Sequence, residues 1–268
     1  MKLPKLSKRL ECVAKLAARS TAESADAAGT GRAAENVIAD VGCDHGLMPI
    51  KLIREGLFRK AILSDIRRDP LERAASNIKL YAPGQAPAFD LRLGSGLETV
   101  SPGEADVVTV SGLSGLTIAE ILAGSPGAAR SVPRFVLQPN TLHRELRLFL
   151  WNNGFEITFE TLAAEGGRIY LVMECRPETK PGGAECRDGI SAVRAEFGDF
   201  IPAHYSAVNE RFLAARLREA LAIKEQILNG PDASLHCERL REVEELTDGI
   251  TRILGFYKES EGCSDDSQ

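Results

Sequence analysis

The stretch NVIADVGCDHGLMPIKLIREG, Asn36 to Gly56, decides the fold of this chain. A run of apolar residues ends on an acid and two glycines, Asp40, Gly42 and Gly46. The chain then continues as a basic amphipathic segment from Leu47 to Glu55. This pattern predicts a strand, a glycine turn and a helix, and the turn is a place where a ligand can be held.

Strands and helices alternate along the following sequence. Further strands are expected at KAILSDI, AFDLRL, ADVVTVSG and RFVLQPN, and further helices at Pro70 to Tyr81, Thr117 to Leu122 and Leu142 to Asn153. The segment FEITFETLAAEGGRIYLVMEC indicates two strands around a Gly-Gly turn. Repeated strand–helix units with a terminal hairpin predict an α/β fold, a Rossmann-like doubly wound sheet of seven strands with one of them antiparallel.

The flanking segments are helical or irregular. Apolar residues at helical spacing predict a basic helix from Leu6 to Arg19, and the small polar residues that follow it up to Glu35 indicate a surface loop. Two charged helical segments predict a C-terminal antiparallel helical hairpin or coiled coil, and they run from Tyr205 to Asn229 and from Leu235 to Phe256. The expected division is 1–176 for the sheet domain, 177–204 for a linker, 205–257 for the hairpin and 258–268 for a disordered tail.

Composition excludes several classes of protein. The 268 residues have a net charge of -5, so any nucleic-acid binding requires a local basic surface. The basic N-terminus lacks the apolar core of a signal peptide, and no run is long enough to span a membrane, so we expect a cytoplasmic protein. The six cysteines are scattered without paired spacing, which argues against a disulfide framework and against a structural metal site.

The glycine turn suggests which ligand it holds. Asp40 and the glycines lie where ligands bind in a doubly wound sheet, beyond the carboxyl ends of the central strands. The spacing is DxGxxxG, which differs from the GxGxxG of a dinucleotide fingerprint. Asp65 ends the second strand, where an acid accepts hydrogen bonds from ribose hydroxyls. The acid, the glycines, the second acid and the terminal hairpin together favour S-adenosylmethionine over NAD.

Several segments resemble one family. The segments LSKRLECVA, IADVGCDHGLMPIKLI, AILSDIRRDPLERAASNI, LRLGSGLE, VVTVSGLSGLTIAEIL, FVLQPN and GRIYLVMEC occur in the order found in the bacterial tRNA (adenine-N1)-methyltransferase family that modifies adenine 22, the TrmK family. The resemblance runs from about Leu6 to Cys175 and implies a class I S-adenosylmethionine-dependent methyltransferase that acts on tRNA. The C-terminal hairpin also matches the architecture of that family.

Roles follow from this resemblance residue by residue. It implies that Asp40, Gly42 and Asp44 line the methionine and sulfonium part of the cofactor site and that Asp65 holds the ribose. The family's Gly-Asp-Gly is Gly94-Ser95-Gly96 here, and its Ala-Gly-Met-Gly-Gly is Ser111 to Gly115. The candidate catalytic residues are Asp44 and His45. The candidate cofactor-binding residues are Asp40, Gly42, Cys43, Gly46, Asp65, Ile66, Gly94, Ser95, Gly96, Ser111 and Gly112, and the candidate substrate-binding residues are Gln138, Pro139, Asn140, Lys8 and Arg9.

The chemistry places few demands on the protein. Adenine N1 has an available lone pair, so its methylation needs alignment and desolvation more than a strong base. Methylation acidifies the exocyclic amine, and Asp44 is the candidate to stabilise the product or accept a proton, with His45 as the alternative. No Asn/Asp-Pro-Pro-aromatic element follows the fourth strand, which favours N1 over the exocyclic amine. The target adenine must leave its stack to be reached.

Simpler structural roles compete with these functional ones. Asp44 is alternatively a cap for the helix at Leu47, and Asn140 a cap for a helix from Thr141. Cys43 fits a small buried residue better than a nucleophile. The basic residues of the N-terminal helix and of the segment after strand two, Lys5, Lys8, Arg9, Arg67 and Arg68, are either a solvated face or the surface that contacts RNA.

Two other functions remain open at this point. The first is a methyltransferase-like RNA-binding protein without activity, suggested by Ser95 and by the loop Ser111 to Gly115. The second is an S-adenosylmethionine-dependent methyltransferase for another substrate, with the hairpin as an oligomerisation arm. The expected partner is tRNA, without membrane or metal, and a monomer is favoured over an oligomer.

Overall fold

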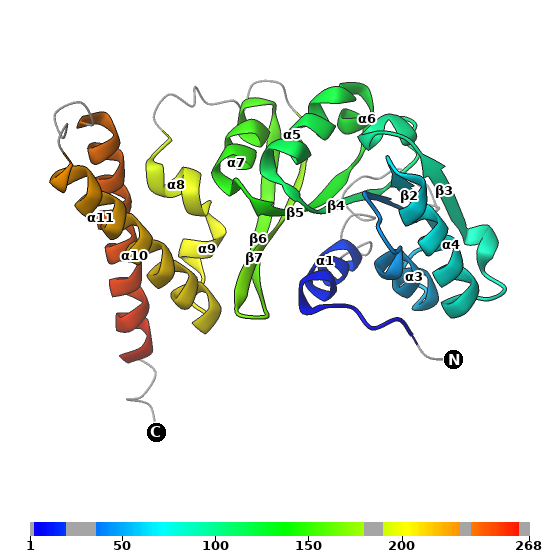
Figure 1. Ribbon diagram of the computed structural model, residues 1–268, viewed down its shortest axis with the longest axis horizontal. Coiled ribbons are helices and arrows are strands. Elements are labelled where there is room, and N and C mark those ends of the chain that lie inside the picture. Colours follow the sequence, from blue (N-terminus) through cyan, green and yellow to red (C-terminus); the bar gives the residue numbers. More distant parts are fainter. Residues whose placement is uncertain (1–2, 20–35, 180–189, 231–236, 263–268) are drawn as a thin grey trace. The chain divides into compact units, whose positions relative to one another are not determined.

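The computed structural model describes residues 3–19, 36–179, 190–230 and 237–262 of the chain (Figure 1). The chain divides into two compact units, Met1–Glu185 and Cys186–Gln268. The surface loop predicted before Glu35 lies outside the described residues.

A seven-stranded sheet forms the first unit, with the strand order β3-β2-β1-β4-β5-β7-β6. Neighbouring strands are parallel from β3 to β5, and β7 is antiparallel to both β5 and β6. The strands are β1 Val37–Val41, β2 Lys60–Asp65, β3 Phe89–Leu93, β4 Val107–Ser114, β5 Arg134–Thr141, β6 Phe155–Glu165 and β7 Arg168–Pro177. The predicted doubly wound sheet with a terminal antiparallel hairpin is therefore confirmed.

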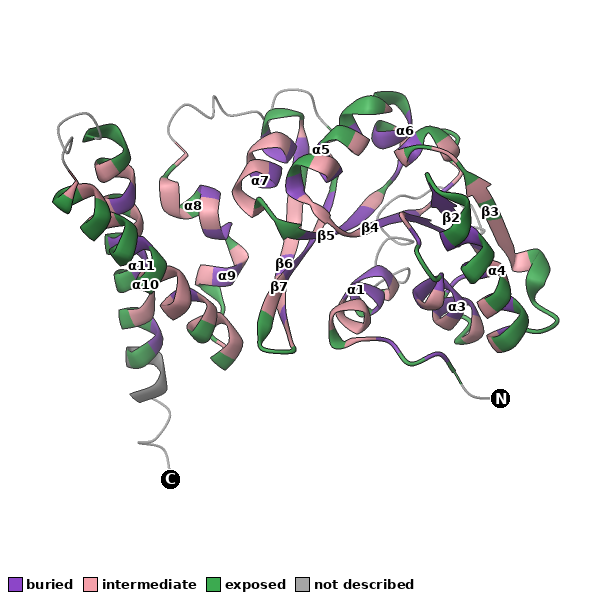
Figure 2. Cartoon of the chain, in the orientation of Figure 1, coloured by how far each residue is buried: buried purple, intermediate pink, exposed green. Residues whose placement is uncertain are grey.

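Helices cover both faces of this sheet. The core on one face joins β1 and β2 to α1 (Lys8–Ala18), α3 (Leu47–Arg54) and α4 (Arg68–Tyr81). Figure 1 shows α5 (Gly115–Gly124), α6 (Pro126–Ser131) and α7 (His143–Asn152) on the opposite side. Buried residues run along the central strands, while the outward faces of the helices are exposed (Figure 2). The apolar strand centres thus form the core between the two helical layers.

Some short elements of the first unit were not predicted. They are α6 and the 3₁₀ helices η1 (Ala86–Ala88) and η2 (Gly96–Thr99). Elements of six residues or fewer lack a long apolar period, so their sequences carry little signal.

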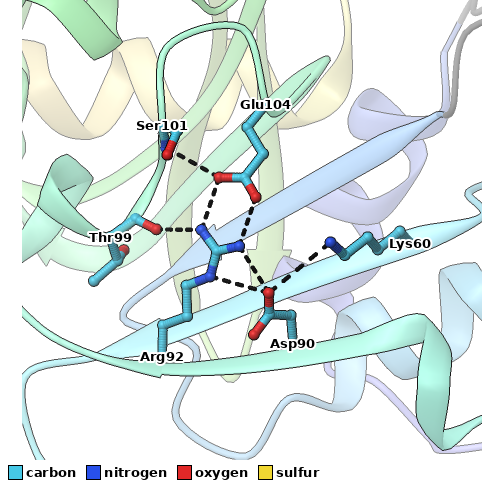
Figure 3. A network of polar contacts seen from close by, with 6 residues as sticks. All are labelled: Lys60, Asp90, Arg92, Thr99, Ser101 and Glu104. Atoms are coloured by element: carbon cyan, nitrogen blue, oxygen red, sulfur yellow. Dashed lines mark hydrogen bonds and ion pairs between the residues drawn. The ribbon is translucent and has the colours of Figure 1, made fainter.

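Polar contacts hold the edge strand β3 to the chain that follows it (Figure 3). The Arg92 guanidinium donates to both carboxylate oxygens of Glu104, at 2.6 and 2.7 Å, and to Asp90 at 2.7 Å. Glu104 also accepts the backbone N–H of Ser101 at 3.0 Å. These hydrogen bonds, that of Arg92 first, lower the pKa of Glu104 to about 2. The carboxylate therefore stays ionised and fixes the chain between β3 and β4 beside the edge strand.

The regular elements in the described part of the second unit are all helices. They are α8 (Ala192–Phe197), α9 (Phe200–Ala203), α10 (Ala207–Asn229) and α11 (Cys237–Gly262). The buried side chains Phe197, Leu213, Ile250 and Tyr257 form the core of this unit.

The structure corrects two predictions about this unit. The predicted linker 177–204 contains two helices, α8 and α9. Ser191 caps α8, and the side chains of Phe197 in α8 and Ile201 in α9 are buried, which stabilises both helices. Helix α11 continues to Gly262, so the tail is not irregular from residue 258 onward as predicted. Tyr257 near this end is almost fully buried, and its hydroxyl donates to the backbone oxygen of Ile201 at 2.6 Å. Buried packing therefore extends the helix beyond the apolar repeat that marked its end in the sequence.

Candidate active site

A cavity of about 490 Å³ lies at the carboxyl ends of β1, β2 and β4. It is bounded by the glycine turn after β1 and by the segments that follow β2, β3 and β4. All residues that the sequence predicts as cofactor-binding line it: Asp40, Gly42, Cys43, Gly46, Asp65, Ile66, Gly94, Ser95, Gly96, Ser111 and Gly112. The structure thus brings these residues together around one space, as expected for an open α/β sheet.

The glycine turn has an unusual backbone. Gly42, Asp44 and Gly46 all have positive φ, at 75°, 47° and 64°. The backbone N–H groups of Gly42 and Cys43 both donate to the carbonyl of Ser64, at 2.8 and 3.0 Å. The turn is therefore fastened to the end of β2.

The two glycines of this turn serve different needs. A Cβ on Gly46 would lie 2.5 Å from the Leu63 side chain and 3.0 Å from that of Ala74, so the close packing here favours glycine. A Cβ on Gly42 would meet no atom within 4 Å. Because Gly42 lines the cavity, that open space is available to a ligand which approaches the backbone.

Two buried carboxylates face the cavity. The Thr109 hydroxyl donates to Asp40 at 2.6 Å, and the backbone N–H of Arg67 donates to Asp65 at 2.9 Å. Burial, opposed by the Thr109 hydrogen bond and reinforced by the charge of Asp65, raises the pKa of Asp40 from 3.8 to about 6. A cationic ligand beside Asp40 would favour the ionised form of this carboxylate.

Asp44 lies at the edge of the cavity with an exposed side chain. Its carboxylate is 3.8 Å from Arg73 Nη1 and 3.4 Å from His45 Nε2. The N-cap of α3 is Gly46 and no side chain caps it, so the interpretation of Asp44 as a helix cap is wrong. Asp44 and His45 are available for contacts with a bound molecule.

The segment Gln138-Pro139-Asn140 lies behind the cavity wall. Gln138 is fully buried, and its Oε1 accepts the backbone N–H of Gly112 at 3.0 Å. Its Nε2 donates to Asn140 Oδ1 at 3.1 Å, and Asn140 Nδ2 donates to the carbonyl of Gly112 at 2.8 Å. None of the three residues lines the cavity. They fix the end of β4, and direct substrate contact remains a prediction for them.

Asn140 is not a helix cap either. Helix α7 begins at His143, and its N-cap is Leu142 in a left-handed conformation. Cys43 is buried, and burial raises the pKa of its thiol, so its interpretation as a small packed residue is confirmed.

The candidate RNA-contacting cations are divided by the structure. Arg9 and Arg67 line the cavity, whereas Lys5, Lys8 and Arg68 are exposed side chains outside it. The Arg9 guanidinium donates to Gln138 Oε1, which joins α1 to the end of β5. Arg9 is therefore part of the wall of the cavity and is not on the open surface of α1.

Sequence reasoning missed Thr109 and Arg73. Thr109 is the one polar residue among the four buried positions at the start of β4, 107–110, and a polar residue within an apolar run was the available signal. Arg73 comes from α4, and nothing in the sequence links it to Asp44. In the part of the chain that the structure describes, no group of three or more His, Cys, Asp or Glu could hold a metal ion, and no helix is long and apolar enough to cross a membrane.

Comparison with known proteins gives consistent matches. The family model described as a methyltransferase domain matches residues 6–173. The tRNA (adenine(22)-N(1))-methyltransferase of Bacillus subtilis (strain 168) is 26% identical over 251 residues, which cover 93% of this chain and 97% of the relative.

Two solved structures are similar to this chain over nearly their full length. The B. subtilis m1A22 tRNA methyltransferase TrmK has 26% identity and a TM-score of 0.75, with 93% of this chain and 99% of that chain covered. M. capricolum TrmK in complex with S-adenosylhomocysteine has 25% identity and a TM-score of 0.71, with 92% and 99% covered.

The raised pKa of Asp40 predicts a specific dependence of stability on pH. The pKa of Asp40 in the folded protein lies above its ordinary value, so its ionisation lowers the free energy of unfolding. This loss is absent below about pH 4, grows between about pH 4 and pH 6, and is complete above about pH 6. Replacing Asp40 by Asn, which can still accept from Thr109, should raise the free energy of unfolding at about pH 7.5 by roughly 2 to 3 kcal/mol. Below about pH 4 the two proteins should be equally stable.

Urea unfolding at both pH values measures this difference. Glu120→Gln, at an exposed position on α5, is the control for removal of one carboxylate and should change little. A gain in stability of the Asp40→Asn protein that is the same at both pH values would mean that titration of Asp40 is not its cause.

Proposed function

The chain belongs to the methyltransferase-domain family, and we propose that it is an S-adenosylmethionine-dependent enzyme that methylates N1 of adenine 22 in tRNA. The observation that carries this proposal is its similarity, over 97% of the relative, to the B. subtilis enzyme named for that reaction. The cavity supports the same reaction, because its residues suit the methyl donor.

The residues of the cavity fit S-adenosylmethionine by charge and by space. The donor carries a sulfonium and an ammonium group, and the cavity presents the buried carboxylate of Asp40 to such cations. Asp65 ends β2, where an acid receives ribose hydroxyls. Gly42 leaves open space beside the backbone. The protein therefore offers acceptors for both halves of the donor.

The side chains of the protein mainly align the reactants. S-adenosylmethionine supplies a methyl group already activated by its sulfonium. Asp40 and Asp65 bind and orient the methyl donor. The hydrogen bonds of the glycine turn to Ser64 fix the positions of these two carboxylates relative to each other. Exclusion of water and alignment account for most of the expected acceleration.

Asp44 is the proposed group that acts on the substrate. Methylation at N1 makes the adenine ring cationic and its exocyclic amine more acidic, and a carboxylate at the cavity edge can stabilise that charge or accept the proton. Arg73 and His45 lie beside this carboxylate, at 3.8 and 3.4 Å. His45 is the second candidate for a contact with the base.

The departures from the family pattern preserve the backbone of the cavity. Gly96 and Gly112 both have positive φ, at 52° and 82°, so the positions that need glycine retain it. Ser114 caps α5, and its hydroxyl accepts the backbone N–H of Thr117 at 3.1 Å. These observations favour an active enzyme over a methyltransferase-like protein without activity.

The substrate is expected to reach the cavity as an unstacked nucleotide. Basic residues must supply the phosphate contacts, since the net charge of -5 does not attract RNA. The proposed contacts are the exposed cations Lys5, Lys8 and Arg68, together with Arg67, which is exposed and also lines the cavity. A cytoplasmic location and a monomeric state belong to this proposal as predictions.

Methyl transfer to tRNA transcripts tests the proposal directly. We expect labelled methyl groups from S-adenosylmethionine to enter a transcript with adenine at position 22, and primer extension to stop there because N1-methylation blocks base pairing. The matched transcript with guanine at position 22 should incorporate at least about 100-fold less label, because N1 of guanine carries a hydrogen and lacks the available lone pair of adenine N1. Equal labelling of the two transcripts would reject the position, and a lack of labelling despite cofactor binding would favour the inactive RNA-binding protein.

Replacement of Asp44 by Asn tests its proposed role. Asn tolerates the positive φ of this position, so the backbone should be retained while the carboxylate is lost. We expect kcat to fall by about 100-fold or more and the affinity for S-adenosylmethionine to stay within about tenfold.

Single-turnover kinetics and calorimetry separate the two effects. Glu120→Gln on α5 again controls for loss of a carboxylate. If Asp44→Asn retained the wild-type kcat, Asp44 would have no part in the reaction.

A further inference from the structure

Leu142, between β5 and α7, combines three features that local structure disfavours. Its backbone is left-handed, with φ 59° and ψ 48°, a conformation that glycine and asparagine adopt far more readily than a bulky residue. It is the N-cap of α7, where a leucine side chain cannot accept a backbone N–H. Its side chain is 41% exposed. Backbone and cap both favour glycine or asparagine here, so the leucine side chain points to a role beyond folding.

The backbone at this corner is held in place from both sides. A Cβ on Gly115 would lie 2.1 Å from the carbonyl oxygen of Leu142, so the corner packs closely against the first residue of α5. The same carbonyl accepts the backbone N–H of Leu146 at 3.2 Å. Just before it, Thr141 is paired in register with Ser114 at the end of β4. Leu142 is therefore presented by a fixed backbone.

The position of Leu142 in the sheet relates it to the cavity. In the described part of the chain, Asp44 and Leu142 are the two residues other than glycine with positive φ. Asp44 follows β1 and Leu142 follows β5, and these parallel strands flank β4, so both residues lie at the carboxyl edge of the sheet. Strained backbone positions gather at functional sites. The strain at Leu142 thus lies on the edge that carries the cavity, beyond β4.

A second exposed leucine lies beside the first. Leu116, in the first turn of α5, is 49% exposed and directly follows the glycine that contacts the Leu142 carbonyl. Leu113, from the same segment, lines the cavity. Residues 111–119 and 135–142 include no charged residue. Leu116 and Leu142 therefore form an uncharged apolar surface next to the cavity, which we call the leucine platform.

The chemistry of the platform suits the faces of nucleobases. Phosphates require cations, and Arg67 and Arg68 supply these after β2, on the other side of β1 from β4 and β5. Base faces are uncharged and stack on apolar side chains. An adenine that leaves its stack to reach the cavity opens a gap between its neighbours, and apolar side chains such as leucine can fill a gap of this kind.

We propose that Leu142, supported by Leu116, takes the place of the extruded adenine in the RNA stack, an inference that rests on the function proposed above. The platform stabilises the opened RNA while the target base occupies the cavity. Leu142 is then a positioning residue, because it contacts the bases that remain in the RNA and not the reacting atoms. Its loss should weaken the use of tRNA without changing the binding of S-adenosylmethionine.

Leu142→Asn removes the apolar side chain and keeps the backbone, because asparagine suits both the left-handed conformation and the N-cap. The midpoint of thermal unfolding should therefore not fall. We expect kcat/KM for tRNA to fall by about 10- to 100-fold, the range for loss of a stacked contact with one base, with unchanged affinity for S-adenosylmethionine. Leu116→Ala should lower kcat/KM by a smaller factor. Leu57→Asn is the matched control, because Leu57 is 40% exposed and precedes β2 at the opposite edge of the sheet.

A transcript with 2-aminopurine at position 22 reports extrusion directly, since the fluorescence of this base rises when it leaves its stack. S-adenosylhomocysteine in place of the methyl donor prevents turnover. At saturating protein, the wild type and Leu57→Asn should raise the fluorescence, and Leu142→Asn should raise it much less although it still binds the transcript in a filter assay.

Wild-type fluorescence or wild-type kcat/KM in the Leu142→Asn protein would overturn the proposal. A wild-type dimer in sedimentation that Leu142→Asn converts to monomers would also overturn it, because a second copy of the chain would then cover the platform. If the wild-type protein neither bound S-adenosylmethionine nor methylated tRNA, the proposed function itself would fail, which is a separate outcome.

Discussion

The packing of Gly46 against Leu63 and Ala74 is the constraint on which the site depends. With a side chain at this position, the Leu63 side chain or the start of α3 would have to shift, because a Cβ there would lie 2.5 Å from Leu63 and 3.0 Å from Ala74. The turn after β1 then has to close within five residues, and the positive φ values of Gly42, Asp44 and Gly46 allow it to do so. This closure sets Asp40 and Gly42 at the cavity and leaves Asp44 at its edge. One close approach between backbone and side chains thus determines where ligand-binding groups lie.

The distribution of charge around the cavity follows from strand order. Asp40 and Asp65 come from neighbouring parallel strands, so their carboxylates are brought to the same edge of the sheet. Arg9 enters from α1 beside β4, on the other side of β1. A ligand that carries a positive charge suits the two carboxylates, whereas the anionic pyrophosphate of a dinucleotide would be repelled by the buried Asp40. The geometry therefore supports the same cofactor that the family membership suggests.

Much of the fold could be predicted because its signals are local. The central strands β1, β2, β4 and β5 contain short apolar runs, and the glycine turn after β1 and the Pro near the start of α4 lie within a few residues of the elements they delimit. The residues around the cavity were predictable for the same reason, since strand ends meet at one edge of the sheet. Arg73, Thr109 and the wall position of Arg9 depend on contacts between distant segments, which no local pattern encodes. Helices α8 and α9 and the end of α11 were missed because burial of Phe197, Ile201 and Tyr257 stabilises them.

The central claim is that the glycine turn holds the cofactor through close approach to its backbone at Gly42. Calorimetric titration of S-adenosylmethionine into Gly42→Val and Gly56→Val tests it most directly. Both glycines have similar positive φ, at 75° and 72°, and open space around a new side chain, but only Gly42 lines the cavity. Equal backbone strain in the two variants leaves occupation of the cavity as the difference. The account predicts wild-type affinity for a folded Gly56→Val and no measurable binding for a folded Gly42→Val; wild-type affinity in both would contradict it.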